Sequence, residues 1–122
     1  MPYFATVCLA LIIGWVTLSP LSEPMQQLAS VPLGAQSAPR LDKLVHLLAF
    51  AVLAAPLAWR YPRLWWVVAL AALAYGGLIE IVQPHVGRSM ELADLLANGT
   101  GAFIGAPIAA RIGRLRQVRS GV

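Results

Sequence analysis

The stretch that decides the fold is LWWVVALAALAYGGLIEIVQ, residues 64–83, in which Glu80 is the one charged residue. A helix of about 20 residues, rising 1.5 Å per residue, spans roughly 30 Å, which is the thickness of the hydrocarbon core of a membrane. In lipid only helices and closed barrels satisfy their own backbone, and this stretch lacks the alternating pattern of a barrel strand. The sequence therefore predicts a membrane-spanning helix over residues 64–83.

Three further apolar segments cover about residues 3–19, 43–59 and 92–110. The chain of 122 residues is 59% hydrophobic and 11% charged, which is more apolar surface than a soluble domain of this length can bury. We therefore expect an all-α membrane protein, a bundle of four transmembrane helices that forms a single domain over residues 1–122. The first segment has no basic leading region and no cleavage site of small residues, so we expect it to be retained.

Basic residues predict the orientation of these helices. Three lie on the side that holds the Pro-rich residues 19–39, and six lie on the other, beside the 61–62 turn or in the tail of residues 111–122. Because basic residues accumulate in cytoplasmic segments, we expect both termini in the cytoplasm and the Pro-rich loop outside. We interpret the tail arginines as a topology signal rather than a lipid site, and we expect no nucleic-acid binding.

Ionisable and amide side chains gather at one membrane face of three predicted helices. Within each helix they are spaced by three or four residues, which places them on one side. Glu80 lies about 24 Å along its helix from Leu64, near the outer edge of the membrane. Since charged groups are costly in lipid, we expect the cluster to face inward and to bind a ligand. Its predicted members are Asp42, Lys43, His46, Glu80, Gln83, Arg88, Asp94 and Asn98.

Glycines continue the polar side of the fourth segment. Gly101 and Gly105 follow Asp94 and Asn98 at helical spacing and form a small-xxx-small pair, which allows another helix to approach backbone to backbone. We expect their packing partners to be Gly76 and Gly77 on the third segment.

Three motifs follow one another across the last three segments. They are DKxxHxxxF at residues 42–50, ExxQ at 80–83 and RSxxxxDxxxNxxG at 88–101. In this order and spacing they resemble the VanZ-like family of bacterial membrane proteins, over about residues 40–106. The family is linked to low-level resistance to the glycopeptide teicoplanin and has no settled biochemical activity. The resemblance implies a role in the cell envelope, within the inner membrane.

The favoured hypothesis is a binding protein whose partners are membrane lipids and an amphiphile, such as a lipid-linked cell-wall precursor. Lys43 and Arg88 would meet a phosphate or carboxylate, and the acids and amides would orient the rest of the head group. No cofactor is expected for this activity.

Two alternatives belong to other classes. In a membrane-embedded enzyme, His46 paired with Asp42 would act as a general base, and Glu80 and Asp94 would act as acids or hold a divalent cation. The lack of a recognised hydrolase, transferase or zinc signature favours binding over catalysis. In a small ion-coupled transporter, four short helices would require a homo-oligomer.

Overall fold

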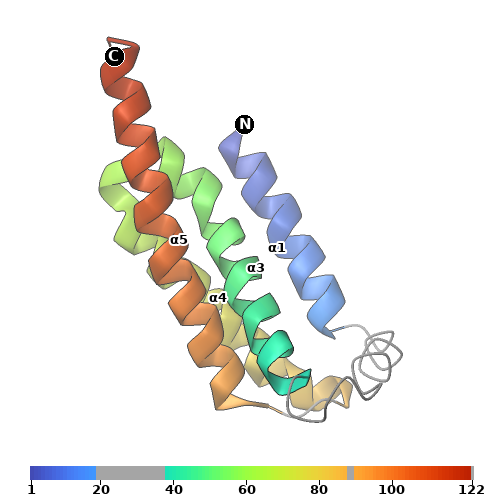
Figure 1. The fold of residues 1–122 in the computed structure, drawn as a ribbon. Coiled ribbons are helices and arrows are strands. Elements are labelled where there is room, and N and C mark those ends of the chain that lie inside the picture. The colour runs from blue at the N-terminus through green and yellow to red at the C-terminus, as the bar shows by residue number, and fades with distance from the viewer. Residues whose placement is uncertain (19–37, 88–89, 122) are drawn as a thin grey trace.

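The computed structural model describes residues 1–18, 38–87 and 90–121, and of residues 38–42 the backbone alone. Every element in these ranges is helical, as predicted (Figure 1). The four main helices are α1 (Pro2–Leu18), α3 (Ala38–Arg60), α4 (Trp65–Val82) and α5 (Leu92–Arg119). Two 3₁₀ turns, η1 (Pro62–Leu64) and η2 (Gln83–Val86), lie at the two ends of α4. Helix α5 is longer than the predicted apolar segment 92–110 and continues through the basic tail to Arg119.

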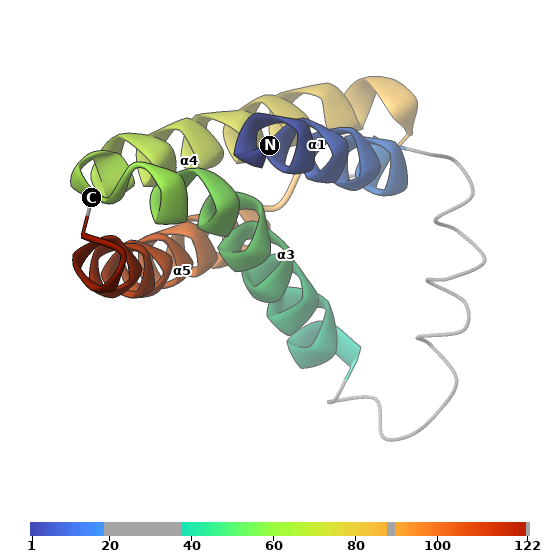
Figure 2. The ribbon, with the colours of Figure 1, turned by 90° about the horizontal axis from the view of Figure 1, so that it is seen from above.

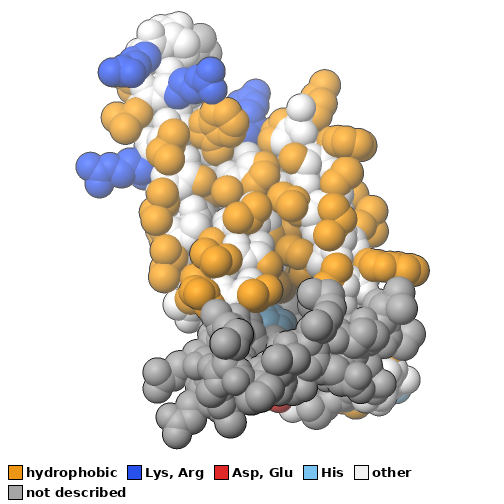
Figure 3. All heavy atoms as spheres, turned by 45° about the vertical axis from the view of Figure 1, so that its right-hand side comes forward, with side chains coloured by type: hydrophobic (Ala, Val, Ile, Leu, Met, Phe, Trp, Pro, Cys, Tyr) orange, Lys and Arg blue, Asp and Glu red, His pale blue; other side chains and the backbone are white. Residues whose placement is uncertain are grey.

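Three helical stretches within the described ranges are long and apolar enough to cross a membrane: Lys43–Arg60, Pro62–Val86 and Leu92–Arg119. Helix α1 is also apolar but shorter, at 17 residues. Large hydrophobic side chains such as Trp15 and Ile108 are exposed. On the face seen in Figure 3, hydrophobic side chains cover much of the middle of the bundle. Such a surface suits lipid rather than water. The fold is a membrane helical bundle of three long helices and the shorter α1. That α1 also crosses the membrane stays a prediction.

Turns at both ends of α4 reverse the chain. Pro62, which lacks an N–H and so suits the first turn of a helix, begins η1 directly after α3. Gly87 ends η2 in the left-handed region at φ 82°, and its N–H bonds back to the Gln83 and Pro84 carbonyls. Helix α4 therefore runs opposite to α3 and α5, which are parallel to each other. Helix α1 packs chiefly on α3, on the side away from α5 (Figures 1 and 2).

The closest packing in the bundle joins α3 to α5 through glycine. A Cβ on Gly101 would lie 2.8 Å from the Leu47 carbonyl carbon, and one on Gly105 would lie 2.5 Å from the Ala51 carbonyl oxygen. Gly113 repeats this contact against the backbone of Trp59. The three pairs keep the same separation along the chain, so the two parallel helices stay in one register from end to end.

The predicted partner of these glycines is wrong. Gly101 and Gly105 pack against α3, whereas Gly76 on α4 faces the side chains of Asn98 and Phe50. The nearest atom to a Cβ on Gly77 is the Leu95 Cδ1, at an ordinary 3.9 Å. The reason is that Phe50, which is buried between the helices, and Asn98 occupy the space beside Gly76, while α3 presents bare backbone to α5.

A single added methyl group tests this register. We expect Gly101→Ala and Gly105→Ala each to lower the free energy of unfolding by about 1–3 kcal/mol, since the methyl group meets rigid backbone. The matched control is Gly77→Ala, a helical glycine with room for a Cβ, which we expect to be neutral or stabilising by up to about 1 kcal/mol. Thermal unfolding of the purified variants in detergent measures both. Equal effects at all three positions would contradict the proposed contact.

Candidate functional site

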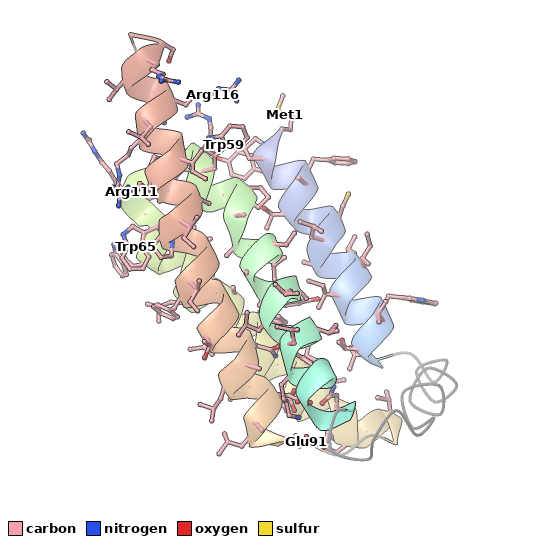
Figure 4. All side chains as sticks on the ribbon, viewed as in Figure 1. Met1, Trp59, Trp65, Glu91, Arg111 and Arg116 are labelled. Atoms are coloured by element: carbon pink, nitrogen blue, oxygen red, sulfur yellow. The ribbon has the colours of Figure 1, made fainter. Side chains whose placement is uncertain are left out.

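A polar cluster lies at the end of the bundle where α3 and α5 begin and α4 ends, marked by Glu91 in Figure 4. Four of its residues are at most 7% exposed, which places them inside the bundle and away from lipid. The predicted site residues with described side chains all belong to this end of the molecule: Lys43, His46, Glu80, Gln83, Asp94 and Asn98.

Lys43 joins the beginning of α3 to the beginning of α5. Its Nζ donates to Glu91 Oε2 over 2.6 Å and also to Asp94 Oδ1. The two carboxylates differ in environment, because the Glu91 side chain is 52% exposed and that of Asp94 is 10% exposed. The lysine therefore has one acidic partner at the rim and one inside, and most of its charge is balanced within the chain.

His46 lies one turn deeper on the same side of α3. Its Nδ1 is 2.9 Å from Asn98 Oδ1, and its Nε2 is 3.7 Å from Asp94 Oδ2. An amide oxygen can only accept, so Nδ1 donates in this contact and Nε2 faces the carboxylate. Both partners come from α5, and His46 directly precedes Leu47, whose backbone contacts Gly101.

Two buried acceptors have no donor among the described residues. Glu80 Oε2 accepts the backbone N–H of Glu91 over 3.1 Å, but Glu80 Oε1 and Gln83 Oε1 are without a partner. Their side chains are 1% and 2% exposed, respectively. A buried acceptor left without a hydrogen bond costs roughly 1–3 kcal/mol, and such a group calls for a bound donor. Within the described part of the chain, the α4 side of the cluster therefore has fewer hydrogen-bond donors than acceptors.

Some predicted members fall outside this description. Asp42 lies in the first turns of α3, but its side chain is outside the described residues, and so are Arg88 and the Pro-rich loop over 19–37. The pairing of Asp42 with His46 stays a prediction. Among the described side chains, no group of three or more His, Cys, Asp or Glu is arranged to hold a metal ion.

Glu91 is not among the predicted site residues, but it belongs to the cluster. Its side chain binds Lys43, and its backbone N–H binds Glu80, so it links all three helices of the cluster. The signal in the sequence is its spacing of three residues from Asp94, which puts both acids at the beginning of one helix.

Because Glu91 is exposed and Asp94 is buried, we expect the two ion pairs of Lys43 to contribute differently to stability. Lys43→Gln leaves the carboxylate of Asp94 without its cation inside the bundle, and we expect a loss of about 3 kcal/mol in the free energy of unfolding. Glu91→Gln removes a rim contact that water screens, and we expect a loss below about 1 kcal/mol. Chemical denaturation of the two purified variants in detergent micelles measures both losses. A larger loss for Glu91→Gln than for Lys43→Gln would show that the rim pair dominates.

Comparison with known proteins identifies the family. No curated protein and no solved structure matches the chain. A family model described as VanZ/LLP1 matches residues 6–113, which is most of the chain and includes every residue of the polar cluster. This match confirms the resemblance drawn from the three motifs. The chain is a VanZ-like protein and belongs to the VanZ/LLP1 family.

Proposed function

We propose that this chain binds the polar head group of an amphiphile at the polar cluster, which faces the outside of the bacterial inner membrane. The observation that carries the proposal is the pair of buried oxygens, Glu80 Oε1 and Gln83 Oε1, that have no donor among the described residues. A head group rich in hydroxyl, amide N–H or ammonium groups would supply those donors.

The charge balance of the cluster narrows the ligand further. Lys43 already contacts two carboxylates, so it offers an incoming phosphate less attraction than an isolated lysine would. The donors on the ligand, rather than its negative charge, would therefore decide which head group is preferred. A lipid-linked cell-wall precursor combines sugar hydroxyls and peptide N–H groups with an apolar anchor in the membrane, and it is the ligand class we favour.

Placement of the cluster at the outer face is part of the proposal. Six arginines lie at the opposite end of the bundle, beside η1 and along the second half of α5 (Figure 3). The bias of basic residues toward the cytoplasm supports cytoplasmic termini and an outward-facing cluster. A protein that holds cell-wall precursors there could change the response to teicoplanin, which is the phenotype linked to the family.

The binding test compares two lipid probes that carry the same polyprenyl chain and differ in their head groups. One is a polyprenyl diphosphate that carries a disaccharide-peptide, and the other is the bare polyprenyl diphosphate. We expect tighter binding of the glycosylated probe, and we expect Glu80→Gln and Gln83→Met each to weaken it about tenfold, because each loses a buried acceptor. Microscale thermophoresis of the purified full chain in detergent measures the affinity.

The matched control for this test is His85→Ala. His85 is exposed, lies just past Gln83 and bonds only to its own helix among the described residues, through the Ile81 carbonyl. The His85→Ala variant should bind both probes as the unmodified chain does. Equal affinity for the two probes, or unchanged binding by folded Glu80→Gln and Gln83→Met, would refute the proposal. Teicoplanin susceptibility of cells that express the same variants then tests the link to resistance separately.

A membrane-embedded enzyme that acts on the same head group is the second candidate. The observation that favours it is the position of His46, held by Asn98 on one nitrogen and facing Asp94 with the other. A histidine oriented in this way can exchange a proton with a substrate. Turnover of the glycosylated probe that is lost in His46→Gln, with binding retained, would favour catalysis, and its absence in the unmodified chain would exclude this candidate.

A further inference from the structure

The end of the bundle opposite the polar cluster contains a large groove. Its volume is about 1160 Å³, which is comparable to the pockets that hold small ligands. Helix α3 forms its floor with Ala55, Pro56 and Trp59, and α1 and α5 form its walls with Ala5 and Ile112, among others. Figure 4 shows Met1, Trp59 and Arg116, which all line the groove, close to one another at this end. The walls are predominantly apolar.

Two arginines form the polar rim of this groove. The Arg116 guanidinium lies over the Trp59 ring, 5.4 Å from its centroid, and the Arg60 guanidinium lies 5.3 Å from the centroid of Tyr61. Stacking uses the face of a guanidinium and leaves the N–H donors along its edge available to a second partner. Both guanidinium groups thus stack on aromatic rings, and of the two rings Trp59 itself lines the groove.

Carboxylates are absent from this end of the described chain. The sequence has no Asp or Glu in residues 43–79 or 95–122, which include η1, the end of α3 and nearly all of α5. Neither Arg60 nor Arg116 has an ion-pair partner among the described residues. The groove therefore combines an apolar interior with a rim whose positive charge the described chain does not neutralise.

We propose that this groove binds a phospholipid with an anionic head group, with an acyl chain along α3 and the phosphate between Arg60 and Arg116. Charge complementarity carries this choice, because a basic pocket between membrane helices at the cytoplasmic surface suits an anionic head group. A free phosphate would leave the apolar walls uncovered. A second copy in the same orientation would bring its own arginines against this rim.

The inference is independent of the outer-face cluster. It changes the interpretation of Arg116, which belongs to the tail that the sequence predicts to be a topology signal rather than a lipid site, and it adds a role to Arg60, which the sequence predicts to mark the cytoplasmic side. Arg60 and Arg116 can serve both purposes, since the positive charge that sets the orientation also lines the groove. Arg63 and Arg111 lie at the same end but do not line it.

The test measures lipid binding by the full chain with native mass spectrometry in detergent. Phosphatidylglycerol and phosphatidylcholine with identical acyl chains are titrated separately. We expect the unmodified chain to retain one phosphatidylglycerol at a concentration about 25-fold lower than phosphatidylcholine requires, from two arginines at about fivefold each. We expect the double variant Arg60→Gln/Arg116→Gln to lose this preference, because each basic residue near an anionic head group contributes about fivefold in affinity.

Two control pairs distinguish a groove from general charge attraction. Arg63→Gln/Arg111→Gln removes the same charge from the same end of the bundle and should keep the preference. Ala5→Phe fills the groove and should weaken binding of both lipids, whereas Val7→Phe on the outer side of α1 should not. Near-identical unfolding temperatures show that each variant is folded.

Several outcomes would overturn the proposal. One is equal binding of the two lipids by the unmodified chain, and another is an equal loss of preference in the two double arginine variants. Full binding by folded Ala5→Phe would place the lipid elsewhere. Displacement of the lipid by glycerol phosphate would show that the rim alone binds a free anion, and a dimer that Ala5→Phe dissociates would assign the groove to a second copy.

Discussion

The rest of the structure depends on the backbone contact between α3 and α5. Two parallel helices can run this close only where side chains are missing, and Gly101, Gly105 and Gly113 supply the gaps. In lipid there is little hydrophobic gain from joining apolar helices, so close van der Waals packing stabilises the pair. The contact also fixes how the two helices are aligned. It also brings together the polar side chains just beyond Gly101, such as those of His46 and Asn98.

Charged side chains are kept away from lipid in different ways at the two ends of the bundle. At one end, Asp94 meets Lys43 and Glu80 accepts the backbone N–H of Glu91, and both buried acids are enclosed by the helices. At the other end, arginines are exposed, and their long side chains can reach the aqueous surface. Between the two ends, the buried interior consists mostly of alanine around Phe50. Charge is therefore separated along the axis of the bundle rather than distributed through it.

Much of this arrangement can be predicted from the sequence, because length and hydropathy are strong constraints in a membrane. Residues 64–83 could hardly form anything but a helix, and the three-residue and four-residue spacings predicted which polar groups share a face. The partner of Gly101 could not be predicted, since a small-xxx-small pair indicates close approach without saying to which helix. The contribution of Glu91 depended on a backbone N–H, which no side-chain pattern reveals. The groove at the basic end is formed by three separate helices, so it has no local signature. For Asp42 and Arg88, the predicted roles stay predictions.

The parallel alignment of α3 and α5 has an electrical consequence for the cluster. Each helix carries a macrodipole equivalent to about half a positive charge at its N-terminus and half a negative charge at its C-terminus. Both α3 and α5 begin at the cluster and place their positive N-termini on the side of Asp94 and Glu91, whereas α4 ends on the side of Glu80 and α1 ends at the same end of the bundle (Figure 1). Among the described side chains, three carboxylates share one lysine in this region: Glu80, Glu91 and Asp94. The N-termini of α3 and α5 thus offset part of the negative excess that the side chains leave, and the same field disfavours any further cation on the α3 and α5 side of the cluster.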